Sequence, residues 1–169
     1  MKLWKKQLAQ ELRNFQKFVI MGIGNPESSD DGLGPEIASN LTDTIRKKYA
    51  DVVVINCGQS PENFTSLVKK EKPSHILIID SCISGKKPGS IFLLRPFDIK
   101  NTDVSTHRLP LYLLYDYLKS ETGAKIIMLG IEPQCITSGA LISNPVRQAV
   151  KEVVEFLLDF LKDRYEGKI

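Results

Sequence analysis

The sequence predicts a three-layer α/β/α domain with a mostly parallel five-stranded mixed sheet and one antiparallel strand, of the phosphorylase/hydrolase-like kind. Three observations predict it. Short β-rich runs alternate with helical stretches along the chain. Two of these runs, HILIID and KIIMLGI, are almost wholly apolar, as strands covered on both faces are. The link SCISGKKPGS between the third and fourth strands leaves no room for a helix, so we expect the fourth strand to run antiparallel.

The expected elements follow from this pattern in chain order. Strands are expected at residues 17–22, 51–56, 75–81, 90–95 and 125–131. Helices are expected at residues 33–48, 61–70, 108–121 and 144–165. Ser60-Pro61-Glu62 and Asn144-Pro145 each combine a capping residue with a proline suited to a first turn, and Ser105-Thr106 offers a third cap.

The first 16 residues, MKLWKKQLAQELRNFQ, contain no uninterrupted apolar run and so do not form a secretory signal. Their apolar residues fall on one helical face, namely Leu3, Trp4, Leu8, Leu12 and Phe15. We therefore expect an amphipathic helix at 1–16 that docks on the body of the protein in preference to a partner. The whole chain, 1–169, is expected to be a single α/β domain with its core at 17–169.

Composition excludes several classes of protein. The net charge of +3 is small and the basic residues are scattered, which is unlike a nucleic-acid-binding surface. The apolar runs are too short to insert into a membrane. The three cysteines are widely separated and form no C-x-x-C pair, so we expect reduced thiols and a cytoplasmic location.

Polar residues gather where the predicted strands end, and in an open α/β sheet ligands bind at the carboxyl ends of the strands. The loop GIGNPESSDDGLG follows the first strand, and Asp80 ends the third. His107 opens the helix that leads to the fifth strand. The remaining polar residues at this edge are Asn25, Gln59, Ser60, Glu62, Glu132 and Gln134.

The acids of this edge point to a cation. Helix capping would explain only one of the two residues Asp30 and Asp31. Asp80 and His107, each considered alone, could also have purely structural roles. Together, however, two carboxylates and an imidazole suit a divalent transition metal such as nickel or zinc. His107 near a helix N-terminus should stay neutral, as a metal ligand must.

Other reaction classes match the sequence less well. The loop lacks the third glycine of the dinucleotide-binding fingerprint, and no G-K-[ST] of a phosphate loop follows. No G-x-S-x-G nucleophile elbow is present. A nucleophilic pair of Cys82 and His107 stays open, although no family signature supports it.

Taken as a set, the motifs resemble those of the hydrogenase maturation proteases, over about residues 17–160. The matching segments are GIGNPESSDDGLG with the following PEIA, then GQSPENF, LIIDSCISGKKPGSI, STHRLPL and IIMLGIEPQ. The subtype resembled is the one that acts on membrane-associated, hydrogen-evolving [NiFe] hydrogenases. The resemblance implies the strand order 2-1-3-5-4, with strand four antiparallel.

The resemblance also implies an activity and a site. Such endopeptidases remove a C-terminal extension from the precursor of the [NiFe] hydrogenase large subunit after nickel insertion. The family's metal-contacting residues correspond to Asp31, Asp80 and His107, which are thus the implied catalytic and nickel-contacting set. Nickel would be carried by the substrate and not held permanently, and Asp30 would serve helix capping or loop shaping.

Two alternatives remain at this point. A nickel-reading chaperone that binds the precursor without cutting it would use the same three ligands. A nucleotide-binding enzyme would instead use the glycine loop for phosphate.

Overall fold

The computed structural model describes residues 1–95 and 111–168 and places five strands in one sheet. The strands are β1 (Phe18–Ile23), β2 (Val52–Gly58), β3 (His75–Ser81), β4 (Ile91–Leu94) and β5 (Lys125–Ile131). Their order is β2-β1-β3-β5-β4, and β4 alone runs antiparallel, against β5. Both the mixed sheet and the strand order that the resemblance implied are therefore confirmed.

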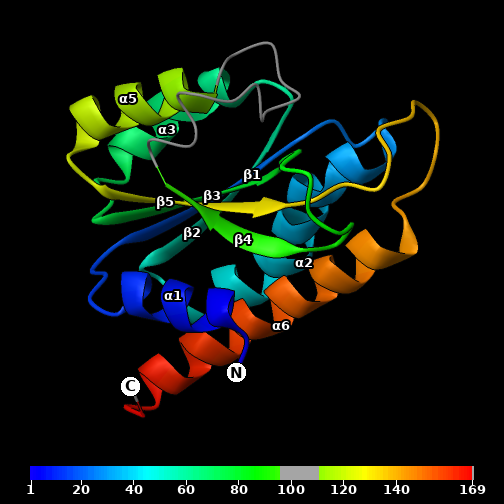
Figure 1. Cartoon of the computed structure of the whole chain (residues 1–169). Coiled ribbons are helices and arrows are strands. Elements are labelled where there is room, and N and C mark those ends of the chain that lie inside the picture. Colours follow the sequence, from blue (N-terminus) through cyan, green and yellow to red (C-terminus); the bar gives the residue numbers. More distant parts are fainter. Residues whose placement is uncertain (96–110, 169) are drawn as a thin grey trace.

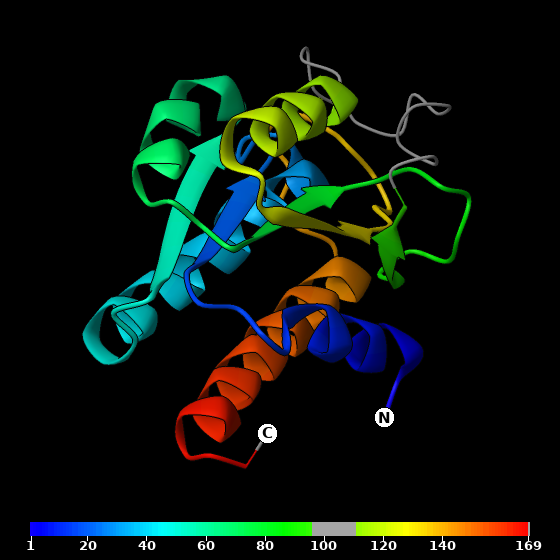
Figure 2. The same cartoon turned by 90° about the vertical axis from the view of Figure 1, so that its left-hand side faces the viewer.

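Helices cover both faces of the sheet, as Figures 1 and 2 show. One face carries α1 (Leu3–Leu12), α2 (Leu33–Lys48) and α6 (Asn144–Tyr165). The other carries α3 (Thr65–Lys70) and α5 (Leu111–Thr122). Alternate residues of β3 divide between the two layers, because Leu77 and Ile79 pack with the first group of helices and Ile76 and Ile78 with the second.

The N-terminal helix docks on the body of the protein, as expected. Trp4, Leu8 and Leu12 of α1 are buried in the same core as α2 and α6, together with Phe15 beyond the helix end. Leu3, which the helical face also predicted to be buried, is 71% exposed. The helix ends at Leu12, so it is shorter than the predicted segment.

The helices expected at 33–48 and 144–165 have the predicted bounds, whereas the other helices depart from their predictions. The expected helix at 61–70 is two elements, a 3-10 turn η2 (Pro61–Phe64) followed by α3. Neither Ser60 nor the residue before α6, Ser143, makes a side-chain capping bond. Residues 108–110 of the expected helix at 108–121, and its Ser105-Thr106 cap, lie outside the described residues.

No helix within residues 1–95 and 111–168 has the length and apolar character needed to cross a bilayer.

Candidate active site

Two of the three predicted metal-contacting residues meet at the carboxyl ends of β1 and β3. Asp31 lies in a short 3-10 turn, η1 (Ser29–Gly32), between β1 and α2, and Asp80 is the penultimate residue of β3. Both side chains are almost fully buried. The third, His107, lies outside the described residues.

Protein backbone fills the space beside the glycines of the loop, where a side chain would otherwise lie. A Cβ on Gly34 would lie 2.1 Å from the carbonyl oxygen of Ile23, and one on Gly24 would lie 1.8 Å from that of Asp31. Gly22 faces Gly34 in the same way, at 2.2 Å. These glycines let the start of α2 press directly onto β1. They leave no room for a phosphate, which argues against the nucleotide-binding alternative.

Ser81 links the two acids. Its hydroxyl donates to Oδ1 of Asp31 at 2.7 Å, and its backbone N–H donates to Oδ1 of Asp80 at 2.8 Å. The other oxygen of Asp31 accepts the backbone N–H of Asn25 at 3.1 Å. That N–H, at the position where a phosphate-binding loop would offer donors, is thus satisfied by a carboxylate.

Asp30 has a different role from the capping predicted for it, whereas the alternative of loop shaping is correct. The residue is fully buried, and neither η1 nor α2 shows a side-chain cap. Its carboxylate accepts the backbone N–H groups of Gln134, Cys135 and Ser143 at 2.8, 3.1 and 2.6 Å, and the Ser143 hydroxyl at 2.9 Å. Asp30 therefore fastens the loop after β5 to the turn that carries Asp31.

The neighbouring Ser29 strengthens this attachment. It is one of two non-glycine residues with a positive φ among those described, at 49°. Its hydroxyl donates to the carbonyl of Leu141 at 2.8 Å. A left-handed serine persists only where its surroundings hold it, and here the loop after β5 supplies that hold.

Glu132, the first residue after β5, holds the loop between β3 and β4. Its carboxylate accepts the backbone N–H and hydroxyl of Ser84 at 2.9 and 2.6 Å and the N–H of Gly85 at 3.2 Å. Burial alone would raise the pKa of Glu132, but the hydrogen bonds from Ser84, Lys86 and Gly85 outweigh it and lower the pKa. Glu132 is thus an ionised anchor for a loop at the rim of the site.

Cys82 is poorly suited to be a nucleophile. Burial, and then the negative charges of Asp80, Glu132 and Asp31, raise the pKa of its thiol well above the ordinary value. A nucleophilic cysteine needs the opposite environment, one that favours the thiolate. The structure therefore argues against the Cys82–His107 pair that the sequence left open.

Of the other polar residues predicted at this edge, Asn25 contacts the acid pair through its backbone N–H, as described above. Within the described part of the chain, Gln59 and Glu62 make no hydrogen bond or ion pair with Asp31 or Asp80. The same part of the chain contains no cluster of three His, Cys, Asp or Glu side chains that could hold a metal ion. Among the described residues, the possible metal ligands at this site are the two carboxylates, Asp31 and Asp80. Two carboxylates could supply some, but not all, of the ligands of a divalent cation.

Sequence reasoning missed Ser81 and Ser143 as contributors to the site. Ser81 directly follows Asp80, and its position on the strand turns it toward the face that α2 covers. That alternation is a signal which could have paired it with Asp31. Nothing in the local sequence connects Ser143 with Asp30, because 113 positions separate the two residues.

The comparisons with known proteins agree with one another. A family model of hydrogenase maturation proteases matches residues 35–160. The hydrogenase 3 maturation protease of Escherichia coli is 33% identical over 140 residues, covering 82% of this chain and 87% of its own length. A Methanocaldococcus jannaschii protein assigned to the same group is 35% identical over 164 residues, covering 94% and 96%. The structure of a [NiFe] hydrogenase maturation protease from Thermococcus kodakarensis superposes with a TM-score of 0.85 at 28% identity, covering 92% and 99%.

Proposed function

The chain belongs to the hydrogenase maturation protease family of endopeptidases, and from this premise we propose its reaction. We propose that it cleaves the C-terminal extension from the precursor of a [NiFe] hydrogenase large subunit once nickel has been inserted. The hydrogen-evolving subtype is part of the proposal. It is supported by the similarity to the hydrogenase 3 enzyme of Escherichia coli.

The observation that carries the proposal is the buried acid pair around Ser81. Two carboxylates held 2.7 and 2.8 Å from one serine form a negative site at the end of the sheet, where a cation on the substrate can be received. In the proposal His107 completes the set, and nickel belongs to the substrate.

The proposed chemistry follows from what the chain offers. The substrate's metal docks on Asp31 and Asp80 and positions the scissile peptide bond beside them. A water molecule attacks the peptide carbonyl, and a carboxylate of the pair accepts the water proton. The same carboxyl group then gives the proton to the peptide nitrogen as the C–N bond breaks, which releases the C-terminal extension as an amine. Because Cys82 is held as a thiol, the water is a better candidate for the nucleophile than the cysteine. We also propose a cytoplasmic location, which the three free cysteines support.

Three substitutions test the site. Asp31→Asn, Asp80→Asn and His107→Ala should each abolish or severely slow cleavage of nickel-loaded precursor, followed by the mass of the large subunit. The first two nearly preserve side-chain volume while removing a negative charge. Asp43→Asn, on the exposed side of α2, and His75→Gln, at the opposite end of β3, are the matched controls and should cleave normally. Normal cleavage by His107→Ala or Asp80→Asn would remove that residue from the site.

Omitting nickel tests the role of the metal. The wild-type protein should leave nickel-free precursor uncut and process nickel-loaded precursor. Cutting of both forms would refute the metal requirement. Tight binding of nickel-loaded precursor with no change in its mass would instead establish the non-cutting chaperone.

A further inference from the structure

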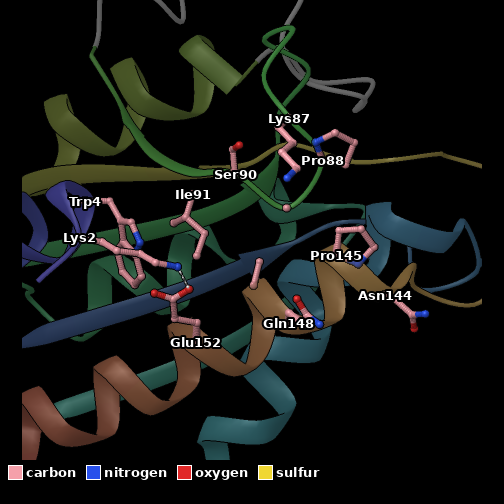
Figure 3. Close-up of a pocket in the computed structure, with 12 residues that line it drawn as sticks. Lys2, Trp4, Lys87, Pro88, Ser90, Ile91, Asn144, Pro145, Gln148 and Glu152 are labelled. Atoms are coloured by element: carbon pink, nitrogen blue, oxygen red, sulfur yellow. Dashed lines mark hydrogen bonds and ion pairs between the residues drawn. The ribbon is translucent and has the colours of Figure 1, made fainter.

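A cavity of about 570 Å³ opens on the face of the sheet that carries α1 and α6. We call it the Trp4 cavity. Figure 3 shows that its walls come from the start of α1, the residues before β4 and the first turns of α6. Its size falls within the range of ligand sites, about 300–1,000 Å³. Because Trp4 belongs to the N-terminal helix, the cavity exists only where that helix is docked.

One loop, between β3 and β4, connects the end of β3, where Asp80 lies, with the cavity. The loop from β3 to β4 is held at one end by the carboxylate of Glu132, through Ser84 and Gly85. The same loop then lines the cavity with Lys87 to Ile91. The backbone of Glu132 bonds this second part too, accepting Gly89 N–H at 2.8 Å and donating to Ser90 at 3.0 Å. A polypeptide bound along this loop would therefore reach both places.

The lining offers hydrogen-bond donors and positive charge. Lys2, Lys87 and Ser90 all line the cavity and are labelled in Figure 3. The one carboxylate, Glu152, is already paired with Lys2 at 2.6 Å and with Lys5 at 3.1 Å. The floor is the N-terminus of α6, a helix of 22 residues whose first turn contains no acid. Such a terminus adds positive potential to that of the lysines.

Trp4 provides an independent sign that a ligand binds. The residue is 5% exposed, and its buried indole nitrogen has no hydrogen-bond partner among the described residues. Figure 3 shows this nitrogen on the side of the ring that faces the cavity. An unmet buried donor destabilises a protein, because it has lost its hydrogen bonds to water without gaining another partner. An oxygen of a bound ligand would satisfy it after a shift of neighbouring side chains such as Lys2, which is 66% exposed.

From these observations we propose that the Trp4 cavity binds an extended, acidic segment of the hydrogenase precursor through its side-chain carboxylates. The excess of donors and the positive charge favour an anionic occupant. The open shape and the shared loop favour a chain that passes through to the acid site. The identity of the partner rests on the proposed function, whereas the preference for carboxylates rests on the cavity alone.

The single tryptophan makes the cavity directly observable, because Trp4 is the only one in the chain. We would titrate the full-length protein with a blocked decapeptide of Gly, Ser and two Glu, and record tryptophan emission. A saturable spectral change is expected with this peptide and none with the Gln counterpart. A third peptide, with Gln residues and a free C-terminal carboxylate, should also have no effect.

Lysine substitutions then locate the binding. Lys87→Gln removes an exposed cavity charge and should weaken peptide binding about two- to fivefold, the range expected for an exposed ion pair. Lys6→Gln makes the same change on an exposed part of α1 outside the cavity lining and is the matched control. With nickel-loaded precursor, Lys87→Gln and Trp4→Phe should raise KM and leave kcat nearly unchanged, while Lys6→Gln changes neither.

Several outcomes would overturn the proposal. They are the absence of an emission change, an equal response to Glu and Gln peptides, a response only to the free C-terminal carboxylate, and equal weakening by Lys6→Gln and Lys87→Gln. Failure of the wild-type protein to cut any precursor would refute the proposed function, and the peptide titration would still decide the cavity. Normal cutting with no peptide response and an unchanged KM in Lys87→Gln would refute the cavity proposal alone.

Discussion

Replacing Asp30 by asparagine should show how the turn that carries Asp31 is held. The carboxylate accepts four hydrogen bonds, one on Oδ1 and three on Oδ2. An asparagine has a single acceptor oxygen, and its NH₂ group must face at least one backbone N–H. In the better orientation the oxygen keeps three bonds and the N–H of Ser143 loses its acceptor.

The magnitude follows from that count. Losing one hydrogen bond to a charged group destabilises a protein by about 1.5–3 kcal/mol. For a chain of this size each kcal/mol lowers the melting temperature by about 2–4 °C, so we expect a fall of roughly 3–12 °C. Cleavage should also slow, because Asp31 is the next residue and shares the turn. This expectation reverses the sequence-based prediction, under which Asp30→Asn would be mild.

Thermal unfolding and precursor cleavage measure the two effects. Asp43→Asn is the control for loss of a carboxylate from an exposed site and should shift the melting temperature by less than about 2 °C. Ser143→Ala removes one of the four donors and keeps the charge, so its effect should be smaller than that of Asp30→Asn. A melting temperature for Asp30→Asn that matches Asp43→Asn would refute the assigned role of the buried carboxylate.

Three further predictions concern other parts of the molecule. Gly34→Ala places a Cβ 2.1 Å from a backbone oxygen and should destabilise the protein by about 3 kcal/mol or more, measured by denaturant unfolding; a smaller loss would mean that α2 can shift. In the native protein a thiol reagent at pH 8 should modify Cys135 alone, because Cys135 is exposed whereas Cys57 and Cys82 are buried. Burial also raises the pKa of Cys57 to about 12, and rapid modification of all three cysteines would contradict the prediction. Burial, followed by the charges of Lys125 and Arg164, lowers the pKa of His75 below its ordinary 6.5, so the unfolded protein binds a proton that the folded protein does not, and stability decreases as the pH falls below about 6.5. His75→Gln should therefore reduce the difference in melting temperature between pH 7.5 and pH 5.5. An unchanged difference would mean that other groups cause the pH dependence.

Strand positions and fold class could be predicted from the sequence, because they depend on local patterns. The strands at 75–81 and 125–131 begin and end where the apolar runs do. The short link after β3 was enough to predict the antiparallel direction of β4. The strand order came from the resemblance, since the alternation of strands and helices is compatible with several orders.

The contacts that build the site could not be predicted in the same way. The capping prediction for Asp30 failed because its donors come from residues more than 100 positions away. The capping prediction for Asn144 was also wrong, because α6 already begins at Asn144. Ser143 holds the N-cap position instead, and its hydroxyl donates to Asp30 and not to the helix. Local rules describe which hydrogen bonds a polar side chain can make with its neighbours in sequence. Here the side chains bond to residues that are distant in sequence instead.

The close packing of glycines between β1 and α2 has a consequence for how tightly a substrate can be held. Because Gly24 and Gly34 press backbone against backbone, the turn with Asp31 has little freedom left once the protein has folded. The conformational entropy of the Asp31 turn is therefore lost during folding and not again when a substrate arrives. A group fixed in advance adds more to affinity than the same group on a flexible loop. Gly24 and Gly34 therefore act on binding through the backbone that they position.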